Sequence, residues 1–179
     1  MYLALGLFGL TLLAGIFYKV SAGSGRSIQK SEVIDLGRIG AQKNGAPITV
    51  TATTSPDTAC VEMGWSRRHS IQGYLAAQEH ILTGGANIRR GGSGALALAW
   101  VAEGRSDGYL EAAMNCWDCL AGMLMVQEAG GSVLAFGSAS GERLSTLRAL
   151  SEPHPVRAST PALAELLDGA LSFAAEPGQ

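Results

Sequence analysis

The chain carries few charged and few aromatic side chains, and it has no run of basic residues. Charged residues make up 16% and aromatic residues 6% of its 179 positions, and 13 Lys and Arg residues nearly balance 15 Asp and Glu residues. Because phosphate contacts with nucleic acids need clustered Lys or Arg side chains, we expect no nucleic-acid partner. An apolar fraction of 47% is enough for one globular domain with a buried core.

Cysteine is scarce, and the motifs of two common hydrolase classes are absent. Three cysteines cannot make a disulfide scaffold, so a reducing, cytoplasmic location is the simplest expectation. Cys116 and Cys119 form a C-x-x-C pair, but zinc needs about four ligands, and neither Cys60 nor any histidine is spaced to complete such a set. We therefore interpret the pair as structural thiols. The sequence has no H-E-x-x-H and no G-x-S-x-G motif, which argues against a zinc protease or a serine hydrolase.

Residues 1–20 form an apolar N-terminal segment with three alternative interpretations. Residues 1–18 contain no charged side chain, so they are a marginal candidate for a membrane helix. A signal peptide is disfavoured because no Lys or Arg precedes the apolar run, although Val20-Ser21-Ala22 resembles a cleavage site. The third alternative is a pair of buried strands, because hydropathy alone does not separate short apolar strands from one helix.

Turn signals and apolar periodicity predict one domain over residues 32–171 and a tail at 172–179. Asn44-Gly45 predicts a hairpin whose second arm is the run 48–54, rich in β-branched residues. Strands that alternate with helices favour a layered α/β domain. Strands are predicted at 32–36, 60–63, 109–111, 132–136 and 156–158, and helices at 71–83, 95–103, 118–129 and 160–171.

Two carboxylates and a glycine-rich helix start are the candidate functional groups. Asp118 lies at the start of a helix, where one oxygen can cap the helix while the other faces a cation. Glu111 ends a strand, where sites occur in open α/β sheets, although a solvated strand end is the simpler interpretation. Gly92-Ser93-Gly94 opens a helix whose free N–H groups can bind an anion. The pairs Arg67-Arg68 and Arg89-Arg90 are interpreted as solvated surface.

Four segments occur in a fixed order across some forty positions: Gly92-Ser93-Gly94-Ala95-Leu96, the stretch 104–111, Trp117-Asp118 with Ala121-Gly122, and Glu128-Ala129-Gly130-Gly131. Together they resemble the C-terminal part of the inositol monophosphatase family. Gly40-Ala41 with the stretch 44–48 is similar to the family's G-A-x-x-N-G-x-x-I hairpin. Gly15-Ile16-Phe17-Tyr18 resembles one of its strands, which favours strands over a membrane helix at the N-terminus.

The resemblance implies a mixed sheet with flanking helices, in the layered α/β sandwich of this group of sugar phosphatases. It also implies a Mg²⁺-dependent phosphomonoesterase that acts on a small phosphorylated polyol such as inositol phosphate, commonly as a homodimer. Asp118 would be a metal ligand, and Glu111 would bind substrate hydroxyls. Gly92-Ser93-Gly94 would present backbone groups to the substrate ring. Ser66 matches a substrate-contacting position, with an ambiguity of one residue caused by Trp65.

The sequence lacks two motifs that the family carries nearer its N-terminus, an E-E pair and D-P-x-D-G-[ST]. Family members take most of their metal ligands from these motifs. One carboxylate cannot hold two magnesium ions about 3.5–4 Å apart, so we expect a truncated phosphatase with impaired activity. The alternative is a non-catalytic paralogue, anchored in a membrane through residues 1–18, that binds a phosphorylated ligand or a partner subunit.

Overall fold

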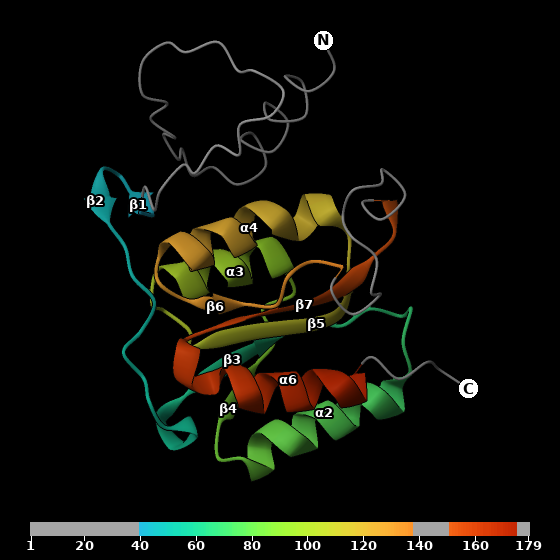
Figure 1. Cartoon of the computed structure of the whole chain (residues 1–179). Helices are drawn as coiled ribbons and strands as arrows, with labels where there is room; N and C mark the ends of the chain where they lie inside the picture. Colours follow the sequence, from blue (N-terminus) through green and yellow to red (C-terminus); the bar gives the residue numbers. More distant parts are fainter. Residues whose placement is uncertain (1–39, 138–150, 175–179) are drawn as a thin grey trace.

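A computed structural model of the chain describes residues 40–137 and 151–174 (Figure 1). These residues form a mixed five-stranded sheet between two pairs of helices, with a separate two-stranded hairpin. The predicted layered α/β architecture, a mixed sheet with flanking helices, is therefore confirmed. The apolar segment 1–20 and the predicted strand 32–36 lie outside the described residues. No helix in the described ranges is long and apolar enough to cross a membrane.

The elements follow one another along the chain largely as the hydropathy pattern predicts. The strands are β1 (Gln42–Lys43), β2 (Ala46–Pro47), β3 (Cys60–Met63), β4 (Asn87–Arg89), β5 (Gly108–Met114), β6 (Ser132–Val133) and β7 (His154–Ser159). The α-helices are α2 (Ile71–Thr83), α3 (Gly94–Ala102), α4 (Cys116–Glu128) and α6 (Ala164–Ala174), and short 3₁₀ turns span Pro56–Thr58 and Pro161–Leu163.

The five-stranded sheet has the strand order β4-β3-β5-β7-β6. Strand β3 is parallel to both of its neighbours, so β3, β4 and β5 have their carboxyl ends at one edge of the sheet. Strand β7 is antiparallel to β5 and β6. The register between β5 and β7 shifts between Glu111 and Met114, and such a bulge re-aims side chains near functional sites.

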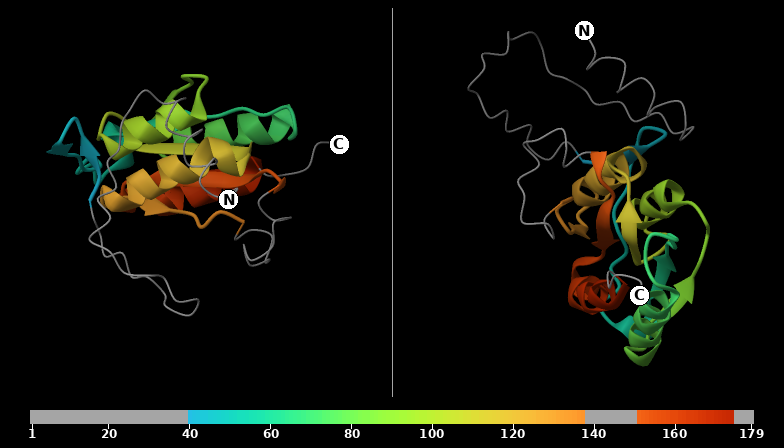
Figure 2. Two further views of the ribbon diagram at one scale, coloured as in Figure 1. Left: turned by 90° about the horizontal axis from the view of Figure 1, so that it is seen from above. Right: turned by 90° about the vertical axis from the view of Figure 1, so that its right-hand side faces the viewer.

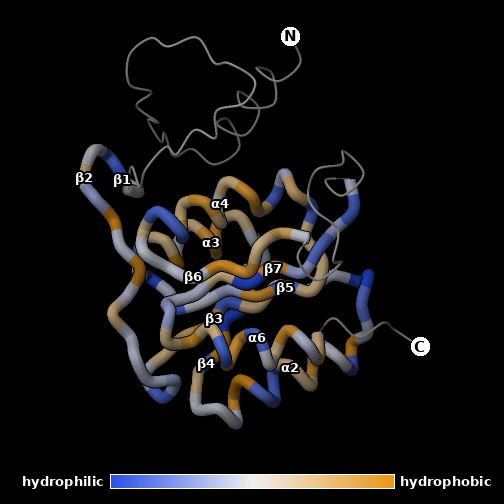
Figure 3. Tube along the Cα trace, in the orientation of Figure 1, coloured by the Kyte–Doolittle hydropathy of each residue, from blue (hydrophilic) through white to orange (hydrophobic). Residues whose placement is uncertain are grey.

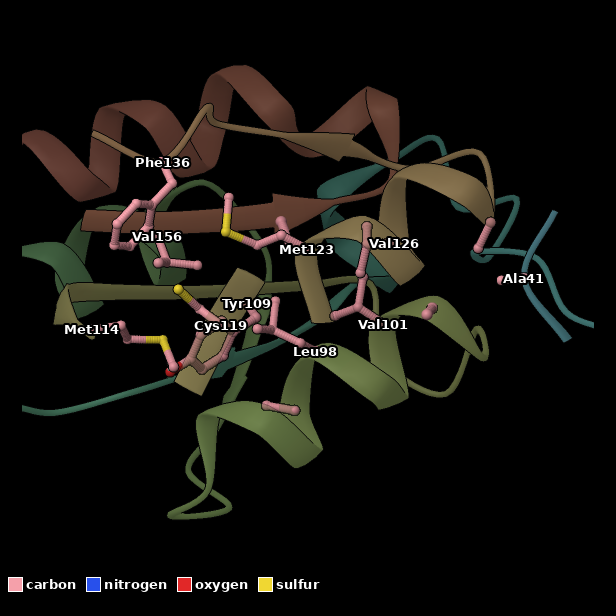
Figure 4. Packing of buried hydrophobic residues seen from close by; sticks show 14 residues of the cluster. Ala41, Leu98, Val101, Tyr109, Met114, Cys119, Met123, Val126, Phe136 and Val156 are labelled. Atoms are coloured by element: carbon pink, nitrogen blue, oxygen red, sulfur yellow. The ribbon is translucent and has the colours of Figure 1, made fainter. Parts of the chain in front are cut away.

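Two helix pairs cover the two faces of this sheet. Helices α3 and α4 pack together on one face, and α2 and α6 pack together on the other (Figures 1 and 2). Because side chains alternate along a strand, Tyr109 of β5 belongs to the core under α3 and α4, whereas Leu110 belongs to the core under α2 and α6. Figure 3 shows apolar positions along the central strands and the neighbouring helices. Figure 4 shows Leu98 beside Tyr109 in the first of these cores.

The structure corrects two predictions, one about the hairpin and one about where the domain ends. Asn44 and Gly45 form the predicted turn with φ angles of 53° and 82°, but residues 48–54 form no strand. Their N–H groups find separate partners, since Ile48 bonds the carbonyl of Ala41 and Val50 bonds that of Ala129. At the other end α6 continues through Ala174, so residues 172–174, assigned to the tail, are helical.

Candidate functional site

A cavity of about 150 Å³ lies at the carboxyl ends of β3 and β4. Loops at this edge of a sheet with parallel strands are a common place for ligand sites. The loop after β3 contributes Gly64 and Trp65, and the loop between β4 and α3 contributes residues 90–94. Strand β5 contributes Tyr109 and Glu111. The structure thus brings the predicted Glu111 and Gly92-Ser93-Gly94 to one cavity.

The position of Glu111 in this cavity is set by Tyr109. The Tyr109 hydroxyl donates a hydrogen bond of 2.5 Å to Oε2 of Glu111, and Sδ of Met114 lies 3.3 Å from the same hydroxyl oxygen. Burial raises the pKa of Glu111, while this hydrogen bond and the charge of Arg68 lower it. Burial and the Glu111 carboxylate both raise the pKa of Tyr109, so the phenol stays protonated and remains a donor.

Two glycines allow the backbone to approach this hydrogen-bonded pair. A Cβ atom added to Gly94 would lie 2.5 Å from the Tyr109 hydroxyl oxygen, and one added to Gly64 would lie 2.6 Å from it. A Cβ atom on Gly64 would also overlap the Glu111 carboxylate. In a close-packed interior a side chain at either position would displace Tyr109, Glu111 or both. Gly64 therefore lies against both members of the pair, and Gly94 lies against the Tyr109 hydroxyl.

Glu62 holds the loop between β4 and α3, a role that sequence reasoning missed. Its side chain is buried, its Oε2 accepts a hydrogen bond of 3.1 Å from the Gly91 N–H, and its Oε1 lies 3.1 Å from Nε of Arg89. Ser93 caps α3, because its side chain accepts a hydrogen bond from the Leu96 N–H. The loop thus presents the start of α3, which has a partial positive charge, to the cavity.

The arginines of both pairs are exposed, as predicted, and some of them also have charged neighbours. Arg89 pairs with Glu62 and lies 5.2 Å over the ring of Trp100. Arg90 instead lines the cavity. The pKa of Glu111, which burial raises, is lowered by the charges of Arg68 and Arg90. The second arginine of each pair therefore contributes positive charge near the cavity carboxylate.

Asp118 lies on the first turn of α4 and does not line the cavity. Asn115 is the N-cap residue of α4, so the interpretation of Asp118 as the cap is wrong. The exposed Asp118 carboxylate accepts a hydrogen bond of 3.2 Å from Nδ2 of Asn115. Burial is the main cause that raises the pKa of Glu111, and the negative charge of Asp118 raises it further. The two carboxylates therefore interact electrostatically.

The described residues do not fit a two-metal site. They contain no group of three or more His, Cys, Asp or Glu side chains that could hold a metal ion. An exposed carboxylate such as Asp118 can supply one oxygen ligand, and Mg²⁺ commonly uses one or two protein carboxylates. Two metal ions that share ligands need more donors than this part of the chain offers.

Ser66 lies beside a second, smaller cavity and not in the lining of the main one. It shares this space with His69 and Tyr74, and its hydroxyl oxygen accepts a hydrogen bond of 3.3 Å from the Arg68 N–H. Trp65 lines both cavities. The ambiguity of one residue in the sequence therefore matters, and a contact between Ser66 and a substrate stays a prediction.

The cysteines of the described region are free, as their interpretation as structural thiols requires. Cys119 is buried, and its Sγ lies 3.3 Å from the backbone oxygen of Asn115. Burial raises the pKa of Cys119 to about 12, so its thiol stays protonated and unreactive. Cys60 and Cys116 are partly exposed.

Comparison of the sequence with models of known families identifies one family. A model of the inositol monophosphatase family matches residues 14–173 of the chain. The chain belongs to the inositol monophosphatase family. The matched range includes every predicted site residue, from Ser66 to Asp118.

The relatives of this inositol monophosphatase family member carry two kinds of name. The chain is 39% identical over 107 residues to the Nus factor SuhB of Xylella fastidiosa, covering 59% of this chain and 39% of that protein. It is 39% identical over 106 residues to the inositol-1-monophosphatase of Synechocystis sp., covering 55% of this chain and 35% of that protein. The structure of inositol monophosphatase from Anabaena has a TM-score of 0.60 at 31% identity, covering 75% of this chain and 52% of that one. The chain thus spans about half or less of the length of these relatives.

Proposed function

We propose that this member of the inositol monophosphatase family binds a small phosphorylated polyol, of the inositol phosphate kind, and takes part in hydrolysing its phosphomonoester. The observation that carries the proposal is the cavity in which Glu111 faces the Gly92-Ser93-Gly94 loop. A carboxylate accepts hydrogen bonds from polyol hydroxyls, and backbone groups of the loop can bind the rest of the ring. Arg90 adds a donor that suits anionic oxygens. The matched inositol-1-monophosphatases support this substrate class.

The proposed hydrolysis depends on magnesium, for which Asp118 would supply one carboxylate. A bound metal ion would stabilise the charge that develops on the phosphoryl group. The sequence contains neither acidic motif, and its described part has no cluster of three potential ligands. The remaining ligands would have to come from outside these residues, so we propose that the chain by itself has little or no phosphatase activity.

The substitution Asp118→Asn tests this assignment in a longer polypeptide that joins both acidic motifs to this sequence. Magnesium-dependent phosphate release from inositol 1-phosphate should fall to background, while the circular dichroism spectrum and Tm stay close to those of the parent because Asp118 is exposed. Glu79→Gln is the control, since Glu79 is an exposed carboxylate that does not line the cavity. Unchanged turnover in Asp118→Asn would contradict the role of Asp118.

A second proposed function is non-catalytic binding of a phosphorylated ligand or a partner subunit. It is favoured because the cavity lined by Glu111 and Gly92-Ser93-Gly94 is present in a sequence that lacks both acidic motifs. The relatives named Nus factor SuhB carry a name that does not refer to a phosphatase. Calorimetry with inositol 1-phosphate, with and without magnesium, should detect binding without phosphate release. A folded sample that does not bind the ligand would exclude this function.

We also propose a cytoplasmic location and, for a polypeptide that carries both acidic motifs together with this sequence, a homodimer. The few cysteines support the first point, and the resemblance to the family supports the second. Carbonate extraction of membranes should leave the protein in the supernatant, and retention in the pellet would instead support an anchor in residues 1–18. Light scattering on the polypeptide that carries both acidic motifs should give the mass of two chains, whereas the mass of one chain would contradict the dimer.

A further inference from the structure

Trp65 lies between the main cavity and the smaller cavity beside Ser66. The main cavity has a volume of about 150 Å³, and the smaller one has about 10 Å³, which is room for roughly one water molecule. Gly64 and the half-buried Trp65 line both spaces. Because Gly64 has no side chain, Trp65 sets where the main cavity ends on this side.

Contacts on two sides hold Trp65 in this position. The N–H of the preceding Gly64 donates a hydrogen bond of 2.9 Å to the Leu110 carbonyl of β5, so the backbone that leads into Trp65 is held against the sheet. The indole packs on the ring of Tyr74, near the start of α2, with ring centroids 5.0 Å apart and planes tilted by 54°. Tilted aromatic pairs at this distance stabilise each other. Trp65 is therefore a fixed wall of the main cavity.

The smaller cavity is lined by two residues whose polar atoms have no partner. Within the described ranges, the buried hydroxyl of Tyr74 and the buried Nδ1 of His69 make no hydrogen bond, and both residues line this cavity. Buried polar groups normally have partners, because an unpaired one is unfavourable. The space behind Trp65 therefore has unused hydrogen-bonding capacity, but it has no room for a group larger than about one water molecule.

The main cavity combines polar groups with this aromatic wall. A polyol ring has a rim of hydroxyl groups and two faces made of C–H groups. Glu111 and the backbone of the loop 92–94 suit the hydroxyl groups, whereas the indole of Trp65 suits a C–H face. Sites for drug-sized ligands have volumes of roughly 300–1,000 Å³. A cavity of about 150 Å³ is smaller than these sites and suits a single small ring.

We propose that Trp65 determines the size specificity of this site, so that the site accepts a phosphorylated polyol with one ring and excludes one with two rings. The inference rests on the proposed binding of a small phosphorylated polyol. Trp65 contacts the single ring and blocks, by steric overlap, the way from the main cavity to Tyr74 and His69. A binding site gains specificity from a clash with the wrong ligand as well as from contacts with the right one.

Calorimetry on the full chain tests the proposal with two probes, inositol 1-phosphate, which has one ring, and trehalose 6-phosphate, which has two. The parent chain should bind inositol 1-phosphate about 10-fold or more tightly than trehalose 6-phosphate, because pocket contacts commonly discriminate by about 10- to 200-fold. Trp65→Ala joins the two cavities and should abolish or reverse this preference. Trp65→Phe keeps an aromatic wall and should retain most of it.

Leu75→Ala is the matched control for these variants. Leu75 is a large apolar side chain next to Tyr74 on α2, but it is 54% exposed and lines neither of the two cavities. Its replacement should leave the ratio of the two dissociation constants unchanged.

The outcomes distinguish failure of this inference from failure of the proposed function. If Trp65→Ala binds inositol 1-phosphate and keeps the parent's preference, the role of Trp65 is wrong and the proposed function stands. Equal affinity of the parent chain for both probes would also overturn the role of Trp65. A folded parent chain that binds neither probe would contradict the proposed function, and the role of Trp65 with it.

Fluorescence gives an independent measurement, which also decides the question if Trp65→Ala does not fold. The chain has three tryptophans, so Trp100→Phe together with Trp117→Phe leaves Trp65 as the only one. Saturating inositol 1-phosphate should lower the acrylamide quenching constant of this variant, because the bound ring covers the indole. An unchanged quenching constant in a sample that binds the ligand by calorimetry would show that the ring does not contact Trp65, and would overturn the proposal.

Discussion

The two sides of the candidate site differ in how completely the described residues build them. On the side proposed to bind the polyol, the Tyr109 hydroxyl donates a hydrogen bond to Glu111, Gly64 lies against the Glu111 carboxylate and Gly94 lies against the Tyr109 hydroxyl. On the metal side Asp118 stands exposed on the first turn of α4, outside the cavity lining. The proposed polyol side comes from loops and strands that meet at one sheet edge. The proposed metal side is incomplete among the described residues, which hold no group of three potential ligands.

The largest expected effect comes from crowding the polyol side. Gly64→Ala should lower the free energy of unfolding by about 1–3 kcal/mol, because its Cβ would overlap the Glu111 carboxylate and approach the Tyr109 hydroxyl. Urea denaturation measures the change. Gln72→Ala on the exposed side of α2 is the control and should shift stability by less than about 0.5 kcal/mol. An equal decrease in the free energy of unfolding in both variants would show that Gly64 is not tightly packed against Glu111.

The next effect concerns ligand affinity on the same side. Glu111→Gln should weaken binding of inositol 1-phosphate by about 10- to 100-fold, because hydrogen bonds to a charged acceptor are replaced by weaker ones. Calorimetry measures the dissociation constant, with Glu79→Gln as a control that should bind normally. Unchanged affinity in Glu111→Gln would place the polyol elsewhere.

A smaller effect is a change in the pH dependence of stability. Burial raises the pKa of Glu111, so the folded protein keeps a proton that the unfolded chain loses near the ordinary value of about 4.3. The contribution of Glu111 to stability should therefore fall as pH rises from that value through the raised pKa. Tyr109→Phe removes a hydrogen bond that favours the carboxylate and should raise the pKa further. Carbon-13 NMR titration of the carboxyl group, with Glu111→Gln for assignment, would detect a shift in either direction.

The smallest expected effect is on the metal side. Asp118→Asn in this chain should change the free energy of unfolding by only about 0.3–1 kcal/mol, the interaction of an exposed acid with the start of a helix. Thermal unfolding in low salt measures it. A loss as large as that of Gly64→Ala would show that Asp118 has a structural role, which would remove the contrast between the two sides.

Local sequence signals predicted individual helices and strands better than the segments with which each of them pairs. The strand at 60–63 and the helix that begins at Ile71 are confirmed, because an apolar run and a terminal glycine pair act over a few residues. The structure adds Ser70 as the residue that caps this helix. The run 48–54 has equally good β-forming residues but forms no strand, since its backbone bonds the hairpin and the end of α4. β-propensity reflects packing neighbours more than the residue itself, and these neighbours lie far away in the sequence.

Sequence by itself determined the family, the layered α/β class and the segments around Gly92-Ser93-Gly94 and Glu111, because ordered motifs and periodicity are local properties. Only the tertiary structure decided that Arg90 faces the cavity while Arg89 pairs with Glu62, and that Asp118 stands outside the lining. The physical reason is that such choices depend on contacts between distant segments. The Glu62 carboxylate, for example, accepts its hydrogen bond from Gly91, 29 positions away.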